Sequence, residues 1–445
     1  MIDVPRLRLR LPAVLPAAIL QNAAAVSAAA LATAGLGYVF WWLAARAFPP
    51  AAIGFAAAVT SAMTLLGTLG VLGLGTLMIA EVGRNPARAG GLVALAMGCA
   101  ALAAAGLGLA FAALTPRISP DLATLAAPMP MALFAVGVGL TAAAIVLDQA
   151  LVGLLRGGMQ LWRNVLFGAS RLIGLGVVWL ALRGAPGDGL AIIATWVAAN
   201  LVSMFPLGQI ARPRRWSLGL RRGRLRALGW NWPVLRGHLG AAVGHHALNV
   251  GLQVPALSLP IVVTVALSAT DDAYFYVAWM LAGVAFLGSS ALTLALYAVA
   301  VREPRHVARY TRVTLGLGLG CGLLAMLGVF TLADPLLGAF FGASYAERTG
   351  PVLRLLIVAA CPLVVIDHFV ALCRIQGRPL VAARLVIPGA AVQLAVAALG
   401  ARVGGLGELS LGWVLGVTVE AALMLPLVIR VVAPRSRRAQ GGSIA

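Results

Sequence analysis

Residues 35–75 read GLGYVFWWLAARAFPPAAIGFAAAVTSAMTLLGTLGVLGLG and carry a single charged side chain, Arg46. Two long apolar runs flank a short break at Pro49 and Pro50. A helix that crosses the hydrocarbon core of a bilayer needs about 20 consecutive apolar residues. Each run extends beyond the quoted stretch and meets that length. We therefore predict two membrane-spanning helices, over residues 18–46 and 51–80, joined by a tight turn.

The composition extends this interpretation to the whole chain. Of 445 residues, 61% are hydrophobic and 10% are charged, and the mean hydropathy is +0.98. Soluble domains carry about 25% charged residues, so a soluble enzyme, a disordered chain and a disulfide scaffold are excluded. The net charge of +20 comes entirely from arginine, but no soluble domain remains to bind nucleic acid. The four cysteines have no CxxC spacing, and we expect no metal site.

Breaking the chain at charges and at Pro/Gly clusters predicts an all-α polytopic membrane protein with about twelve transmembrane helices. They cover residues 18–46, 51–80, 89–114, 129–155, 164–182, 189–210, 239–267, 273–300, 313–333, 351–373, 380–401 and 409–430. The domains that follow are an N-terminal six-helix lobe (1–210), a basic linker (211–238), a C-terminal six-helix lobe (239–432) and a basic tail (433–445).

Arginines alternate along the chain in a way that sets the orientation. Every second loop is arginine-rich, whereas the alternate loops have fewer arginines and carry acidic residues such as Asp121 and Glu408. The arginine-rich set comprises residues 6–10, 84–88, 156–163, 212–236, 302–312, 374–378 and 430–438. Basic loops remain cytoplasmic. We therefore expect a multi-pass protein of the cytoplasmic (inner) membrane with both termini, the linker and the tail in the cytoplasm.

The two halves of the sequence resemble each other. One offset separates Asp148 from Asp367 and also Gly158 from Gly377. Because six predicted spans lie between the copies, both halves have the same orientation. We predict two parallel six-helix lobes around a central cleft, which is the arrangement that alternating-access transporters use.

Four ionisable residues inside the spans are the first candidates for a functional site. Counting from the predicted turns, Asp148 lies at the depth of Arg171, and Asp367 lies near the depth of Arg384. Each pair is either a structural ion pair or a pair whose arginine lines the cleft and binds an anionic headgroup. Arginine suits the second role because its planar fork binds phosphate oxygens and stays charged. Arg46, at the outer end of the first span, is either an exit residue or an interfacial charge.

Two further spans carry polar residues at suggestive positions. His245, Asn249 and Gln253 share one helix face, and Pro255 and Pro260 follow, where they should bend the helix. This pattern predicts a gating helix beside the cleft, or hydrogen bonding between helices of the two halves.

Glu420, in the middle of the last span, is the candidate carboxylate for coupling to a proton or sodium gradient. Its alternative is a structural partner to a neighbouring backbone group or arginine. We expect no bound cofactor.

The stretch from Gly35 resembles the first helix pair of the polysaccharide biosynthesis flippases. These O-antigen and exopolysaccharide transporters belong to the multidrug/oligosaccharidyl-lipid/polysaccharide exporter superfamily. The shared features are Ala45 and Arg46 at the helix end, the turn at Pro49 and Pro50, and Gly54. The segment from Asp367 through RIQGRPLVAAR is similar to the tenth-to-twelfth helix region of that family.

This resemblance implies a lipid flippase. The substrate would be an undecaprenyl-pyrophosphate-linked oligosaccharide, moved from the inner to the outer leaflet for surface polysaccharide synthesis. Arg171 and Arg384 could supply a cationic cavity. Membrane lipids, a polysaccharide polymerase and chain-length proteins would be its partners.

Two alternatives remain open. A cation-coupled multidrug antiporter shares the fold but typically has an acidic residue in its first helix, where this chain has none. A non-transporting scaffold for polysaccharide assembly would tolerate a filled cleft.

Overall fold

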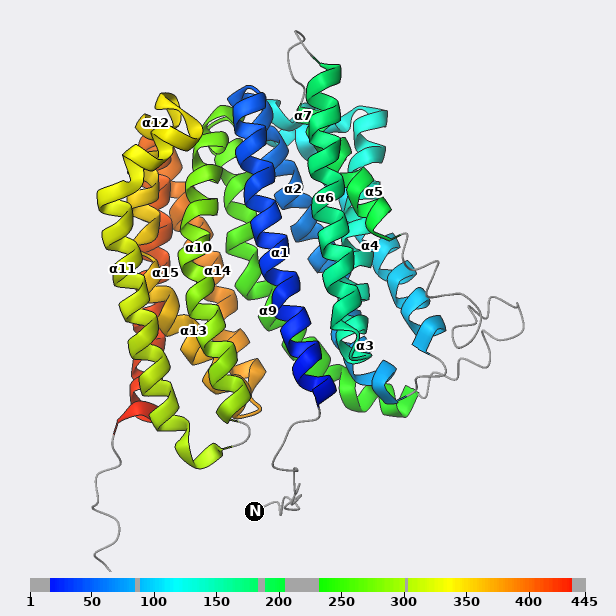
Figure 1. The fold of residues 1–445 in the computed structure, drawn as a ribbon, viewed down its shortest axis with the longest axis vertical. Coiled ribbons are helices and arrows are strands. Elements are labelled where there is room, and N and C mark those ends of the chain that lie inside the picture. The colour runs from blue at the N-terminus through cyan, green and yellow to red at the C-terminus, as the bar shows by residue number, and fades with distance from the viewer. Residues whose placement is uncertain (1–16, 85–88, 183–188, 205–231, 301–302, 434–445) are drawn as a thin grey trace, which may run out of the picture.

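The computed structural model describes residues 17–84, 89–182, 189–204, 232–300 and 303–433 (Figure 1), and these form helices and no strand. The elements are α1 (Ala17–Ala47), α2 (Pro50–Gly70), α3 (Leu74–Arg84), α4 (Ala89–Ile118), η1 (Pro120–Ala126), α5 (Pro128–Gly153), α6 (Gly157–Ala181), α7 (Gly189–Ser203), α9 (Trp232–Ala266), α10 (Ala269–Ala300), η2 (Pro304–His306), α11 (Val307–Phe341), α12 (Ala343–Ile357), α13 (Ala360–Ile375), α14 (Pro379–Gly404) and α15 (Leu406–Val432).

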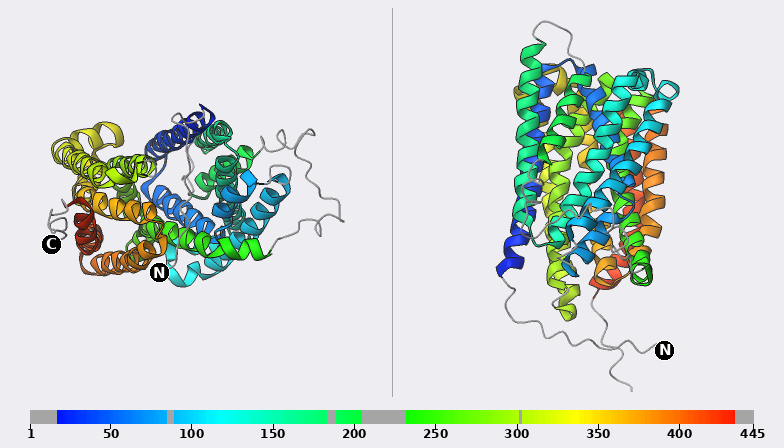
Figure 2. Two further views of the ribbon diagram at one scale, coloured as in Figure 1. Left: turned by 90° about the horizontal axis from the view of Figure 1, so that it is seen from below. Right: turned by 90° about the vertical axis from the view of Figure 1, so that its right-hand side faces the viewer.

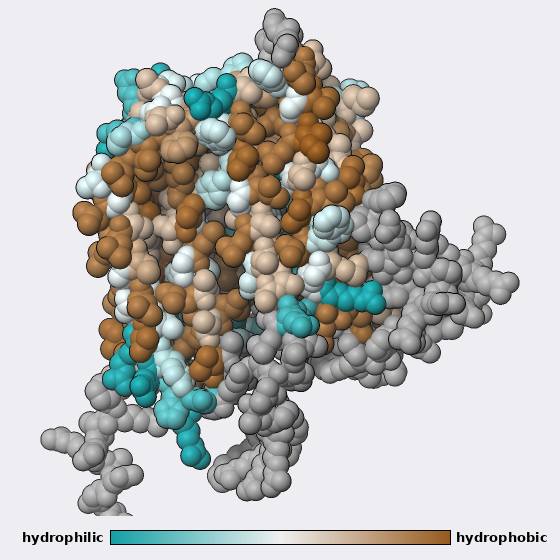
Figure 3. Space-filling model, viewed as in Figure 1, coloured by the Kyte–Doolittle hydropathy of each residue, from teal (hydrophilic) through white to brown (hydrophobic). Residues whose placement is uncertain are grey.

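The helices have the length and composition of a multi-pass membrane protein. Within the described ranges, ten are long and apolar enough to cross a bilayer. α12 and α13 together form an eleventh crossing that bends by 42°, and the shorter apolar helix α7 completes the predicted twelve. The surface agrees, because apolar side chains cover the middle of the visible face and polar ones gather near its two ends (Figure 3).

Proline and glycine set several helix boundaries. α2, α5 and α14 each begin with a proline, which fits the first turn because its missing N–H needs no partner there. The predicted span 51–80 is instead two helices. Leu72 and Gly73 have φ angles of 50° and 79°, which end α2 and redirect the chain into α3. Glycine supplies the second of these conformations at no steric cost.

The chain forms two lobes with separate hydrophobic cores. One core is built almost wholly from α1–α7 and the other from α9–α15. Ala269 and Ala273 of α10 join the first core, and Ala45 of α1 joins the second. Viewed along the helices, the lobes occupy opposite halves of the molecule (Figure 2).

The predicted linker and tail fall mainly outside the described residues. Of 211–238, only the part from Trp232 is described, and it forms the beginning of α9. The tail 433–445 lies outside the description beyond Ala433.

We call the end of the bundle where α1 begins and α15 ends the lower end, and the opposite end the upper end, as in Figure 1. The lobes are hydrogen-bonded to each other in the upper half. Asp121 of η1 accepts a bond from the backbone N–H of Ala269 at 2.6 Å. The indole of Trp42 donates to the carbonyl of Phe340 at 2.8 Å, and the Tyr38 hydroxyl donates to the carbonyl of Met280.

Candidate functional site

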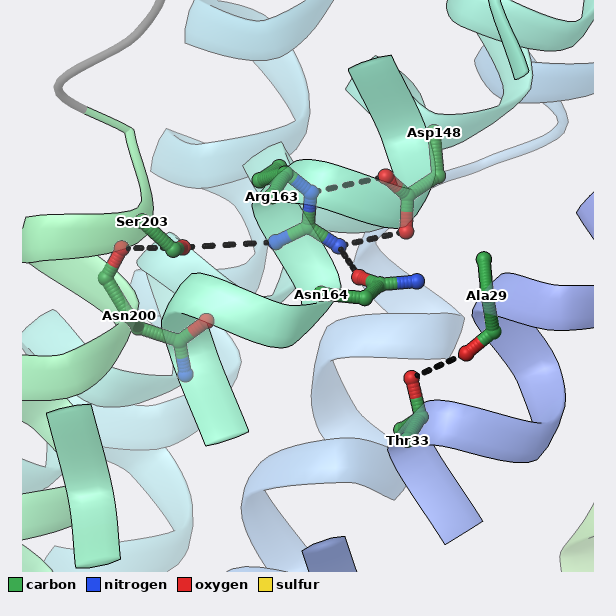
Figure 4. Close-up of polar contacts among 7 residues, drawn as sticks. All are labelled: Ala29, Thr33, Asp148, Arg163, Asn164, Asn200 and Ser203. Atoms are coloured by element: carbon green, nitrogen blue, oxygen red, sulfur yellow. Dashed lines mark hydrogen bonds and ion pairs between the residues drawn. The ribbon is translucent and has the colours of Figure 1, made fainter. Parts of the chain in front are cut away.

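A charged cluster lies near the lower end of the first lobe, between α5, α6 and α7 (Figure 4). Asp148 accepts two bonds from Arg163, at 2.7 Å from Nε and 2.5 Å from a terminal nitrogen. The guanidinium also donates to Asn164 Oδ1 at 2.6 Å and to Ser203 Oγ at 3.3 Å. Such a bidentate pair is the strongest arrangement these two groups can make. The cluster therefore ties three helices of one lobe together.

This arrangement corrects the predicted pairing of Asp148 with Arg171. α5 ends at Gly153 and α6 begins at Gly157, so the turn centres near Leu155 rather than Gly158. At 1.5 Å per residue, Asp148 then lies about 10 Å from the turn and Arg163 about 12 Å, whereas Arg171 lies about 24 Å away. The prediction placed the turn three residues too late, so it paired Asp148 with Arg171 instead of Arg163.

Arg171 is held by aromatic rings. Its guanidinium carbon lies 4.6 Å from the ring centre of Phe40, 5.1 Å from that of Phe167 and 4.8 Å from that of Trp196. The residue is only 3% exposed, and its Nε has no hydrogen-bond partner. Gly37 of α1 makes room for the group, because a Cβ there would lie 3.3 Å from a terminal nitrogen.

The charge of Arg171 is therefore desolvated without an anionic partner among the described residues. Removing an ion from water costs several kcal/mol. Each ring stabilises the guanidinium by roughly 0.5–2 kcal/mol through cation–π attraction. Three rings together therefore offset much of the cost of removing the charge from water. The result is a buried guanidinium that retains unused hydrogen-bonding capacity.

The second lobe carries a related cluster at its lower end. Arg374 of α13 donates to Asn249 Oδ1 on α9 at 2.8 Å, and it lies within electrostatic range of His245 and Asp367. Asp367 accepts a bond from Ser290 of α10 at 3.3 Å. The predicted residues His245, Asn249 and Asp367 thus gather around an arginine that the sequence interpretation did not single out.

Arg384 does not pair with Asp367, which corrects the second predicted ion pair. The depth estimate was sound, but depth says nothing about helix face. Arg384 is exposed on α14 and lines a cavity of about 140 Å³ together with Glu420 of α15. Counting the residues on each side of Gly377 could not reveal that the two side chains point to different neighbours.

Glu420 is 5% exposed and accepts a 2.5 Å bond from the amide of Gln393. The other end of that amide accepts a 3.0 Å bond from the indole of Trp413, which fixes its orientation. Gly389 lies so close to the carboxylate that a Cβ there would overlap it and force the carboxylate to move. Glu420 therefore has a structural partner, and its ion-coupling role stays a prediction.

The remaining candidates are dispersed. Gln253 is exposed on α9, and this helix continues through both Pro255 and Pro260. Arg46 stacks over Trp42 at 5.8 Å and lines a cavity of about 300 Å³ between α1 and α6. Among the residues described, no group of three His, Cys, Asp or Glu side chains could hold a metal ion.

Solved transporter structures match this architecture over nearly its full length. An inward-facing multidrug resistance MATE family transporter of the MOP superfamily has a TM-score of 0.65 and 16% identity, covering 91% of this chain and 94% of its own. The MATE transporter VcmN of Vibrio cholerae, solved as a mutant, has a TM-score of 0.61 and 17% identity, covering 94% and 96%. The chain has the MATE fold.

A third matching structure is a transporter whose binding pocket differs in polarity. A MOP superfamily transporter from Pyrococcus furiosus has a TM-score of 0.57 and 15% identity, covering 93% of this chain and 95% of its own. It is described as having a binding pocket of reverse polarity that suggests a different function. No protein-family model matches the sequence, and no curated protein matches it either. At these identities the likeness establishes the fold, and the substrate must be argued from residues.

Proposed function

We propose that this protein is an alternating-access transporter that flips an undecaprenyl-pyrophosphate-linked oligosaccharide to the outer leaflet for surface polysaccharide synthesis. The observation that carries the proposal is Arg171, a buried guanidinium with three aromatic neighbours and no anionic partner among the described residues. A pyrophosphate would supply the missing acceptors. A site for cationic drugs needs the opposite charge.

A groove on the side of the bundle supports a substrate with a hydrocarbon tail. It has a volume of about 680 Å³ and lies between α1 of the first lobe and α10–α12 of the second. Its lining is almost entirely apolar and includes Trp42, Gly328, Leu332 and Phe340. A lipid-linked sugar must leave its tail among the acyl chains while its headgroup crosses. A groove shared by both lobes would guide that tail, whereas a soluble drug has no use for it.

The orientation follows from the arginine pattern. If the arginine-rich ends are cytoplasmic, the lower end of the bundle faces the cytoplasm. The hydrogen bonds between the lobes in the upper half then close the outward side. The described conformation would accept substrate from the cytoplasmic leaflet.

Replacing Arg171 by glutamine tests the proposal. Arg171→Gln removes the charge but keeps a polar side chain, and we expect at least a tenfold loss of surface polysaccharide in the source organism at an equal membrane level of the protein. The matched control is Arg402→Gln, because Arg402 is an exposed arginine near the upper end of α14. Normal polysaccharide in the Arg171 variant would contradict the flippase proposal and favour a scaffold. Sensitivity to cationic dyes that changes with wild-type expression would favour the multidrug antiporter.

A further inference from the structure

Asp272 is a completely buried carboxylate at the boundary between the lobes. It lies in the first turn of α10 and is 0% exposed. The hydroxyl of Thr264 on α9 is close enough to interact with this carboxyl group, but no hydrogen bond of normal geometry reaches either oxygen or that hydroxyl. Buried polar groups are normally hydrogen-bonded, so an exception needs an explanation.

The burial of Asp272 depends on contact between the lobes. The neighbouring residue Ala273 and the helix start at Ala269 belong to the core of the first lobe. Gly54 of α2 packs so closely that a Cβ would overlap the carbonyl of Ala269. Ser119 contacts the carbonyl of Thr264 at 3.5 Å, and Asp121 caps Ala269. Separation of the upper ends would therefore expose the Asp272 carboxylate to water.

The charged and titratable groups around Asp272 do not neutralise it. Tyr276, one turn further along α10, lies in electrostatic range of Asp272, of Tyr38 on α1 and of Arg171 on α6. The ring of Trp41 packs 4.7 Å from that of Tyr276. On η1 and in the same turn of α10, the nearby groups are the carboxylates Asp121 and Asp271, and Asp271 bonds to Ser268 at 2.7 Å. The cation of this network, Arg171, acts on Tyr276, and no arginine is among the groups that act on Asp272.

An ionised carboxylate in this place would be strongly unfavourable. Burying an unpaired ion costs several kcal/mol, and the N-terminus of α10 offsets at most about 2 kcal/mol of that cost. A bound proton removes this cost, since the neutral acid carries no charge and can also donate to the Thr264 hydroxyl.

We propose that Asp272 is a proton-binding site whose occupancy controls contact between the upper ends of the lobes. A proton bound to the carboxylate permits closure. Opening hydrates Asp272, which releases the proton to water on the upper side and leaves an anion that resists closure until a proton returns. In the transport cycle proposed above, on which this role rests, proton release would thus be coupled to outward opening.

Spin-label distances across the upper end test this site without any transported substrate. The exposed residues Ala51 of α2 and Ser344 of α12 are replaced by cysteine in a full-length background in which the native cysteines Cys99, Cys321, Cys361 and Cys373 are replaced. The protein is labelled in lipid nanodiscs. If closure binds one proton, raising the pH by one unit should increase the ratio of separated to close molecules by up to about tenfold.

The variants separate this proposal from a general pH effect. Asp272→Asn mimics the protonated acid, so we expect the close population at every pH between 5 and 9. Asp271→Asn removes the adjacent carboxylate and should behave like the wild type. A wild-type distance that does not change with pH overturns the proposal, as does an Asp272→Asn protein that still responds. A shift caused by sodium at constant pH would also overturn it. Because no glycan is present, failure of the flippase proposal would leave this result unchanged.

Discussion

The two buried arginines of α6 compensate their charges in different ways. Arg163 is bound by the carboxylate of Asp148, whereas Arg171 is surrounded by Phe40, Phe167 and Trp196. They lie eight residues apart on one face of the helix. The first arrangement saturates the guanidinium and favours a structural role. The second leaves its Nε without a hydrogen-bond partner, which is why the functional proposal rests on Arg171.

The ion pair should therefore matter for stability. Arg163→Met leaves Asp148 without its partner, and we expect a loss of about 3 kcal/mol, because breaking a buried pair strands a charge. The double variant Arg163→Met/Asp148→Asn should recover part of the stability lost in Arg163→Met. The measurement is the thermal unfolding midpoint in detergent.

The exposed pair between Arg354 and Asp334 provides the control, at 2.8 Å with side chains 28% and 57% exposed. Asp334→Asn should cost less than about 1 kcal/mol. Equal midpoints for Arg163→Met and Asp334→Asn would show that the Asp148 pair is not structural.

At this scale the sequence located the polar residues inside the bundle better than it indicated their partners. Asp148, Asp367 and Asn249 were found because charged and polar side chains are costly inside apolar spans. Arg163 and Arg374 were treated as loop arginines, although each reaches back to a polar residue within the bundle. Asp272 lies between the predicted spans 239–267 and 273–300, and only the packing of the two lobes reveals its burial.

At the scale of helices, α14 and α15 are joined by an internal polar contact. Gln393 binds Glu420 and Trp413 at once. We expect Gln393→Leu to cost roughly 1–3 kcal/mol for each polar group left unpaired, which should lower the unfolding midpoint. Glu420→Gln keeps an acceptor for the Gln393 amide and should leave the midpoint nearly unchanged. Normal transport by that variant would exclude Glu420 from ion coupling, whereas a stable but inactive variant would support it.

The α2–α10 contact should control the conformation of the upper end. Gly54→Ala places a methyl group against the carbonyl of Ala269, and a forced fit of this kind costs about 1–3 kcal/mol. The labels at residues 51 and 344 should report a larger separated population. Gly35→Ala is the control, since its Cβ would meet no atom within 4 Å. An unchanged distance in Gly54→Ala would mean that the two helices adjust without opening.

The sequence predicted where most helices lie, but it did not predict where a helix is interrupted. Apolar length located each crossing, but α11 extends from Val307 to Phe341 rather than over 313–333, because helices continue into the interfacial region. The α2–α3 break depends on positive φ angles at Leu72 and Gly73. Many other glycines in the chain remain helical, so the sequence could not mark this one as a breaker.

At the scale of the molecule, the internal repeat explains why two lobes could be predicted. Matching halves with one orientation require two similar bundles, and the two hydrophobic cores agree with that. The repeat did not predict how the lobes touch, because the contacts at Gly54, Asp121 and Trp42 have no counterpart within a single lobe. The lateral groove likewise exists only where α1 meets the second lobe.

That groove offers a test of the substrate class for the whole molecule. Gly328 lines it, and a Cβ at Gly328 would have no neighbour within 4 Å. Gly328→Leu should therefore fold normally while filling the space available to a hydrocarbon tail, and we expect transport of a lipid-linked sugar to fall severalfold in proteoliposomes. Gly320→Leu lies on the same helix, is equally free of contacts and does not line the groove, so it should transport at the wild-type rate. If both variants transport equally, the tail travels elsewhere. If dye export rather than lipid transport is found and neither variant impairs it, the groove has no part in the function.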